Sequence, residues 1–182
     1  MKKLVAIFLV LAAMMGAVAL AEGVQMISAP NTQAAEEVFM DDIKLGKEIE
    51  VEGYGVITPI SCDVYDSISF YNRVDSGNEA QLYVLVIEIL NKQYVPASYV
   101  ESVAVEAEFG EGYKFGGWWR QYQGSESNDF KEKGASYEVN PLYVGKYAFG
   151  VTVPNFVAES TEPLSITVSL SDDIVLTYHV RK

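Results

Sequence analysis

The chain offers few side chains that could act as an acid, a base or a nucleophile. His179 is its single histidine. A catalytic histidine needs an orienting partner and a positioned nucleophile, such as the serine of a Gly-x-Ser-x-Gly turn, and the sequence contains no such turn. Strand alternation sets His179 on the face opposite Leu176 and Tyr178. We therefore expect an exposed histidine on a strand and no catalytic residue.

Cys62, the single cysteine, also argues against reactive chemistry. It shares a predicted strand face with Ile60 and Val64, where a cysteine behaves as a small apolar residue. The adjacent Asp63 would raise the pKa of the thiol and so disfavour the reactive thiolate. One cysteine excludes a disulfide framework, and one cysteine with one histidine cannot form a zinc site. We expect a buried, inert thiol.

The 25 acidic residues allow only weak predictions. Asp41-Asp42, Asp172-Asp173 and residues 126–129 could contribute oxygen ligands to calcium, but none has the spacing of an EF-hand loop. A carboxylate pair could hydrolyse glycosides, yet so acidic a chain always offers such a pair. The net charge of −12 would repel nucleic acid and anionic membrane surfaces. We predict no metal, no cofactor and no nucleic-acid partner.

A predicted hairpin carries the one segment that suggests binding. Gly110-Glu111-Gly112 has the composition of a three-residue hairpin loop. That loop sets Phe109 opposite Tyr113 and Glu108 opposite Lys114, and the second pair is a favourable match of charges. The same register predicts Tyr113, Phe115 and Trp119 on the core face, Ala104 opposite Trp118, and Ser102 opposite Arg120.

The outer face of this hairpin is the candidate partner-binding patch. It comprises Glu106, Lys114, Trp118, Arg120 and Tyr122. Trp and Tyr rings stack on sugars or on aromatic side chains, and Arg adds hydrogen-bond donors in a fixed geometry. The alternative is that the loop at residues 124–136 covers this face and that Trp118 packs beneath it, since aromatic residues are also good strand formers.

The elements that would position these residues are strands. The run Leu82 to Leu90 is almost unbroken in apolar residues, which is typical of a central strand covered on both faces. Residues 164–170 and 174–180 alternate cleanly around a turn at residues 171–173. Eight or nine such segments follow one another from about residue 38, with no strong helical period. This pattern predicts an all-β antiparallel β-sandwich, with a closed β-barrel as the second possibility.

Two of these segments resemble a known group of domains. A central hydrophobic strand ends in Asn at Leu82 to Asn91, and a late strand opens on a Pro-containing turn and closes on Val-Pro, at Asn140 to Asn155. In these features, over roughly residues 45–180, the chain is similar to immunoglobulin-like β-sandwich domains of unknown function in exported proteins of Gram-positive bacteria. The resemblance implies an extracellular binding or interaction module without catalytic residues.

The amino terminus has the pattern of a secretory signal peptide. Lys2 and Lys3 precede an apolar run that ends at Ala19-Leu20-Ala21, a small-x-small cleavage site. We predict a signal-peptide helix at residues 1–21 with cleavage after Ala21, a flexible leader at 22–37 and one domain at 38–182. Glu22 stands where a lipoprotein would have its cysteine, so we expect a released extracellular protein that does not insert in the membrane after cleavage.

These observations favour a secreted, non-enzymatic module that binds an extracellular protein or a glycan. Two alternatives stay open. A secreted hydrolase that uses carboxylates would need a cleft holding two acids in opposed environments. An accessory structural domain without a ligand would have Trp118 fully covered.

Overall fold

The computed structural model describes residues 38–68, 77, 79–99, 103–123 and 137–182, and the backbone of residues 74–75 and 131–132. The predicted signal peptide and leader, and most of the loop at 124–136, lie outside these residues. The elements are β1 (Val38–Met40), β2 (Ile49–Val51), β3 (Gly55–Tyr65), β4 (Ser67–Ile68), β5 (Val74–Asp75), β6 (Ala80–Asn91), β7 (Ala104–Phe109), β8 (Tyr113–Gln123), β9 (Lys131–Glu132), β10 (Val144–Pro154), α2 (Asn155–Glu159), β11 (Leu164–Ser171) and β12 (Ile174–Arg181).

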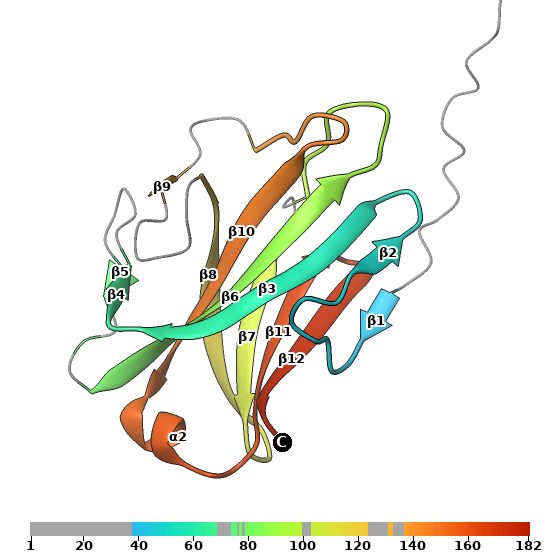
Figure 1. The fold of residues 1–182 in the computed structure, drawn as a ribbon. Helices are drawn as coiled ribbons and strands as arrows, with labels where there is room; N and C mark the ends of the chain where they lie inside the picture. The colour runs from blue at the N-terminus through green and yellow to red at the C-terminus, as the bar shows by residue number, and fades with distance from the viewer. Residues whose placement is uncertain are drawn as a thin grey trace, which may run out of the picture. The chain divides into compact units, whose positions relative to one another are not determined.

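The long strands form two antiparallel layers, as Figure 1 shows. One layer has β7, β11 and β12, and the other has β3, β6 and β10, with β8 shared between the layers. The order β3-β6-β10-β8 corresponds to strands A-B-E-D of an immunoglobulin domain, and β7-β11-β12 corresponds to C-F-G. The predicted all-β sandwich is confirmed.

Strand β8 passes from one layer into the other. Its first half pairs with β7, where Glu106 lies opposite Gly116, and its second half pairs with β10 from Gly117 onward. A Cβ atom at position 117 would lie 2.5 Å from the Gly150 carbonyl oxygen and 2.7 Å from a methyl group of Val105. Glycine is therefore required where the two layers converge, and the shared strand gives the sandwich a barrel-like closure on this side.

The opposite side is closed by the segment between β1 and β2. β1 pairs in parallel with β12 at the edge of one layer, and β2 pairs with β3 at the edge of the other. Between them, the Ile43 N–H donates to the Thr177 carbonyl, and the Gly46 N–H donates to the Pro59 carbonyl. This segment therefore joins the outer strands of the two layers through backbone hydrogen bonds.

Strand β6 is buried on both faces, as its apolar run predicts. Leu85, Ile87 and Ile89 belong to the main core between the layers, whereas Leu82, Val84 and Val86 belong to a second core on the other side of the strand. The second core also contains Ile68, Tyr122 and Ala148, and Ile60, Tyr65 and Trp118 pack against it. The layer that contains β6 therefore exposes little of this strand to solvent on its outer face.

A β-bulge at Ile60 changes the facing of β3. Pro59 pairs with Ile87 and Ser61 with Val86, which leaves Ile60 as the extra residue. Ile60 packs against the second core, and Cys62 packs against the main core. The prediction that both residues share one face was wrong, because the inserted residue interrupts the alternation of side chains along the strand.

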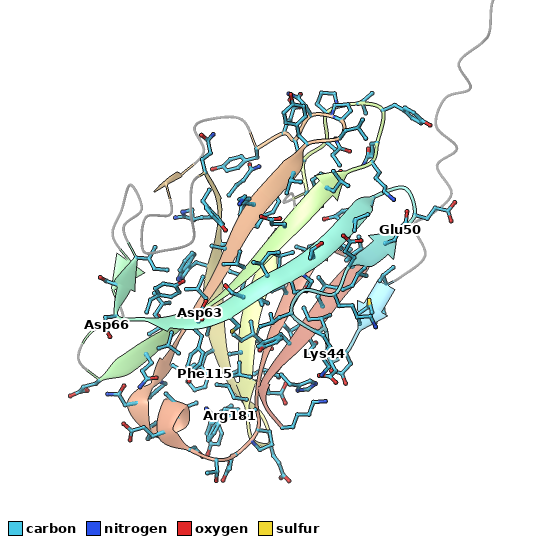
Figure 2. The ribbon with its side chains drawn as sticks, viewed as in Figure 1. Lys44, Glu50, Asp63, Asp66, Phe115 and Arg181 are labelled. Atoms are coloured by element: carbon cyan, nitrogen blue, oxygen red, sulfur yellow. The ribbon has the colours of Figure 1, made fainter. Side chains whose placement is uncertain are left out.

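The single helical turn α2 was not predicted from the sequence. It connects β10 to β11 at one end of the sandwich (Figure 1). Arg181 at the end of β12 holds it: its guanidinium donates to the carbonyls of Val157 at 2.7 Å, Ala158 at 3.0 Å and Glu162 at 3.1 Å. Figure 2 shows Arg181 at this end. Since a helix leaves its last carbonyls without internal partners, a cation here satisfies them.

Candidate binding surface at the loop end

The residues of the predicted hairpin patch lie in two different environments. The register of the loop-proximal half is as predicted, with Glu108 opposite Lys114 and Phe109 opposite Tyr113. Lys114 lies 2.7 Å from Glu106 in an exposed ion pair. Tyr113, predicted on the core face, is instead 70% exposed next to the turn. This half of the patch is a solvated strand surface.

The other half of the predicted patch belongs to the second core. Beyond Gly116, β8 pairs with β10 and not with β7, so Trp118 lies opposite Gly150 and Arg120 opposite Ala148. The expected pairing of Trp118 with Ala104 was therefore wrong. Tyr122 was predicted on the outer surface with Lys114, but it is only 2% exposed. Trp118 and Arg120 are half-buried.

A different surface lies at the end of the sandwich opposite α2, which we call the loop end (residues 92–98 and 137–144; Figure 1). Its two segments are tied to each other by backbone hydrogen bonds. The Asn91 carbonyl accepts a hydrogen bond from the Leu142 N–H, and the Asn91 N–H donates to the Tyr143 carbonyl. Ala97 and Val139 exchange two further hydrogen bonds. The segments therefore form one connected platform.

Buried polar side chains beneath this platform hold its two segments in place through hydrogen bonds. The Asn91 side-chain amide donates to the carbonyls of Val95 and Val139, and its oxygen lies 2.8 Å from the Tyr99 hydroxyl. Tyr99 and Tyr54 meet edge to face with ring centroids 4.7 Å apart. Burial raises the pKa of Tyr99 to about 12, and burial likewise raises the pKa of Tyr54 well above its usual range. Both phenols stay neutral at physiological pH and act as hydrogen-bonding groups.

The platform presents large apolar side chains to solvent. They are Tyr94 (100% exposed), Leu142 (78%), Tyr143 (68%), Val95 (59%) and Val144 (48%). Single exposed apolar residues are ordinary on protein surfaces, whereas several gathered on two connected loops are less common. Loops at one end of a β-sandwich are also where variable immunoglobulin domains bind their partners.

Leu142 adopts a backbone conformation that its side chain disfavours. It has φ of 63° in a turn where the Tyr143 N–H donates to the Asn140 carbonyl and Pro141 precedes it. This position of the turn normally holds Gly or Asn, and a left-handed leucine costs about 1–2 kcal/mol. No burial compensates for this strain, because the side chain is mostly exposed. Strained backbone positions cluster at functional sites, which makes the loop end a candidate site.

The charges near this surface are paired. Lys92 forms an ion pair with Glu50, and Lys146 lies 3.0 Å from Glu88. The chain as a whole carries a net charge of −12. The loop end therefore presents apolar side chains on a chain whose overall charge is strongly negative.

A cavity of about 290 Å³ adjoins the platform on the side of β8 and β10. Its walls include Gln121, Val139, Asn140, Tyr143, Gly145 and Lys146. Its volume lies just below the range typical of ligand pockets, roughly 300–1,000 Å³. Since Tyr143 belongs both to the cavity and to the platform, the two features form one continuous candidate site.

Two residues were predicted to be chemically inert, of which Cys62 was expected to be buried and is partly buried. Burial, with a smaller effect from Asp63, raises the pKa of the Cys62 thiol to about 12. His179 is half-buried and not fully exposed as expected, because its Nε2 lies 2.8 Å from Asp41 Oδ1. Within the described ranges no three metal-ligating side chains gather, and no helix is long and apolar enough to cross a membrane.

Sequence reasoning missed the loop end because its residues follow no period. Tyr94 and Leu142 lie in short segments between strands, where alternation predicts neither burial nor exposure. One signal was available: Asn140-Pro141-Leu142-Tyr143 reads as a turn with Pro at its second position, which places Leu142 where Gly is favoured. A leucine at such a position indicates backbone strain.

Fold and loop end together define the class of protein: a β-sandwich of immunoglobulin strand order with an apolar loop platform. Among solved structures, the chain is similar to an uncharacterised β-sandwich protein from Clostridium difficile 630, with a TM-score of 0.62 and 18% sequence identity over 80% of this chain and 97% of that chain. At this identity the similarity shows the fold alone. No family model matches the sequence, and no curated protein matches it.

Proposed function

We propose that this chain is an exported, non-enzymatic module that binds an extracellular protein through its loop end. The observation that carries the proposal is Leu142, which is held in a left-handed conformation and yet exposed. Selection for stability alone would favour glycine at this turn position. A leucine there is explained if its side chain contacts a partner.

The composition of the platform favours a protein partner over a glycan. Leu142, Val95 and Val144 are aliphatic, and aliphatic side chains gain free energy by burial against apolar protein surface. Sugar recognition depends more on aromatic faces and hydrogen-bonding groups, of which Tyr94 and Tyr143 supply a part. The predicted signal peptide at residues 1–21 is what supports export.

The test compares capture by the wild-type chain with capture by two variants. In the first, Tyr94→Ser, Leu142→Gly and Tyr143→Ser together remove the apolar platform. In the second, Phe156→Ser removes an exposed aromatic of α2 at the other end of the sandwich, 68% exposed, as a matched control. Immobilised proteins are incubated with surface proteins of the producing organism and, in parallel, with a glycan array, and any captured protein is then purified for affinity measurement.

The proposal expects a protein whose affinity falls by about 100-fold or more in the platform variant, since aromatic and large apolar anchors dominate interface energies. The Phe156→Ser variant should bind it like the wild type. Equal affinity of all three proteins would overturn the proposed surface, and saturable binding to a glycan instead of a protein would assign the module to the alternative partner class.

A further inference from the structure

The second half of strand β3 is an edge of its layer that β2 leaves open. β2 pairs only with residues 55–57, and the strand continues well past β2 in Figure 1. The Pro59 carbonyl accepts from Gly46 and so points away from β6. Because the bulge then inserts Ile60, the next residues that turn their N–H and C=O groups outward are Cys62 and Val64. Among the described residues, these outward groups have no backbone partner.

The interior beside this edge is only partly covered. Along β12, the core-facing Ile174 and Leu176 are buried, whereas Tyr178 and Val180 further along the same face are half-buried. On β3, Val64 follows Cys62 on the core-facing side and is 50% exposed. The segment between β1 and β2 joins the two layers only as far as its hydrogen bonds to Thr177 and Pro59 reach. Beyond these bonds, apolar side chains of both layers are open to solvent.

The two layers are nevertheless close to each other here. Burial, and to a smaller extent the neighbouring Cys62 and Asp63, raise the pKa of Tyr178. The Tyr178 side chain therefore lies near this part of β3. An extended chain added beside Cys62 and Val64 would cover Val64 and Tyr178 with the side chains that it turns inward.

Asp63 determines which chain fits. It alternates with Cys62 and Val64, so its side chain lies on the outer face of the layer, where it is exposed (Figure 2). Within the described ranges it forms no ion pair, whereas the exposed Glu50 and Glu106 each pair with a lysine. A residue placed directly opposite Asp63 on an added strand would gain most if it were cationic.

A second copy of this chain fits the edge poorly. Antiparallel pairing of two copies, with Cys62 bonded to Val64 of the other copy, would place two Asp63 carboxylates directly opposite each other. Like charges in this arrangement destabilise a pair of strands. A charged residue on an edge strand is also a common means of preventing self-association. The edge is therefore suited to a different chain with a basic residue at this position.

We infer that residues 61–65 of β3 accept an extended segment of another protein, in which one Lys or Arg stands between two apolar residues. In such strand addition, main-chain hydrogen bonds supply affinity and the side chains supply specificity. The apolar residues lie opposite Cys62 and Val64 and turn inward, and the basic residue lies beside Asp63. This site is independent of the loop end, since Gly55 pairs with Asn91 at that end and Tyr65 is about 30 Å further along the strand.

The test uses three synthetic pentapeptides. The first is Ac-Thr-Val-Lys-Val-Thr-NH₂, which has the inferred pattern. The second has Glu in place of Lys, and the third has N-methylated valines, which cannot donate to β3. The ¹⁵N-labelled chain is titrated with each peptide at low ionic strength, and NMR spectra follow the backbone N–H groups of Cys62 and Val64.

Two variants test the charge, and a third tests the backbone. Asp63→Lys reverses the charge at the edge. Glu52→Lys, at an exposed position in the turn before β3, makes the same change in net charge away from the edge. Val64→Pro removes one outward N–H at a position where an edge strand tolerates proline. Melting curves check that each variant is folded, and if Val64→Pro is unfolded, the N-methylated peptide alone decides the backbone requirement.

The inference expects saturable shifts at Cys62 and Val64 with the Lys peptide, and binding of the Glu peptide at least about threefold weaker. Asp63→Lys should reverse this preference, whereas Glu52→Lys should retain it. The N-methylated peptide and the Val64→Pro variant should give no saturable shift. Absence of shifts in the wild type, equal binding of the N-methylated peptide, or a preference that Asp63→Lys leaves unchanged would overturn the inference. Shifts at Cys62 and Val64 that depend on protein concentration without peptide would assign the edge to a second copy and overturn it as well.

The same titration separates this inference from the proposed function. The variant that lacks the apolar platform should bind the Lys peptide like the wild type, because the platform lies at the other end of β3. Shifts confined to Tyr94 and Tyr143 would place the peptide on the loop end and would overturn the edge site while leaving the docking surface intact.

Discussion

Trp118 occupies the space that a side chain on Gly150 would need. The two residues are directly paired between β8 and β10, and a Cβ atom at position 150 would lie only 2.1 Å from Trp118 Cζ2. The indole thereby packs against the second core and closes the outer face on which a binding patch was predicted. The absence of a side chain at position 150 decides where this tryptophan lies.

Replacing Gly150 with Ala should destabilise the protein. The added methyl group must displace the indole of a half-buried tryptophan, and such overpacking costs about 1–3 kcal/mol. Urea denaturation followed by tryptophan fluorescence measures the loss. The matched control is Gly116→Ala on β8, where a Cβ atom meets nothing within 4 Å, and it should leave the midpoint nearly unchanged. An equal loss in both variants would contradict the packing explanation.

Leu142→Gly should make the protein more stable. Glycine adopts the left-handed conformation without steric cost, although part of the gain is offset by its greater freedom in the unfolded chain, so we expect a net increase of about 0.5–1 kcal/mol. Thermal unfolding provides the measurement. Tyr143→Gly, at a neighbouring exposed position without a positive φ, should lower the stability instead. A destabilised Leu142→Gly would mean that the leucine has a structural role.

Arg181→Lys should loosen α2. Arg181 donates to three carbonyls in and after this turn, and the single ammonium group of lysine cannot reproduce that forked geometry. We expect a loss of about 1–2 kcal/mol in the free energy of unfolding, since hydrogen bonds to charged donors are worth more than neutral ones. Faster hydrogen exchange at Ser160, whose N–H donates to Val157, would locate the effect.

The adjacent Lys182 is the control for this substitution. Its ion pair with Asp42 is on the surface, where solvent screens the charges, so Lys182→Met should cost much less than Arg181→Lys. If Lys182→Met were as damaging as Arg181→Lys, charge at the carboxyl terminus and not the carbonyl contacts would explain both.

The Asp42 carboxylate should make the free energy of unfolding decrease at acidic pH. Hydrogen bonds from Lys182 and then Lys44 lower the pKa of its carboxyl from 3.8 to about 2. Because the folded value is depressed, this contribution is complete above about pH 4 and is lost as the pH falls toward 2. In the Asp42→Asn variant, the urea denaturation midpoint should therefore decrease less between about pH 4 and pH 2 than it does in the wild type. Lys44→Met with Lys182→Met should reduce this decrease in the same way, and an unchanged slope in both would contradict the assignment.

Much of the fold could be predicted from patterns within single strands and turns. The two faces of β6 follow from the unbroken apolar run at Leu82 to Leu90, and the opposition of Glu108 and Lys114 follows from a three-residue loop. Both are local patterns, in which side-chain period and turn length fix the geometry.

The rest depended on contacts between distant residues. The sequence near Gly117 does not predict that the pairing partner of β8 changes there from β7 to β10. The requirement for glycine at this position arises from close contacts with Val105 and Gly150, which are distant in the sequence. The burial of Tyr122 depends on Ile68 and Val84, which come from other strands of the fold. The sequence also gives no sign that the Gln121 amide has no hydrogen-bond partner among the described residues.

The parallel pairing of β1 with β12 has a mechanical consequence. Val38 lies beside Ile174 and Met40 beside Leu176, so the chain enters at one end of this pair and the last strand leaves at the other. A force that pulls the two termini apart would load the connecting hydrogen bonds in shear, all at the same time, and would not peel them one after another. This short ladder would therefore resist tension in proportion to the number of its bonds.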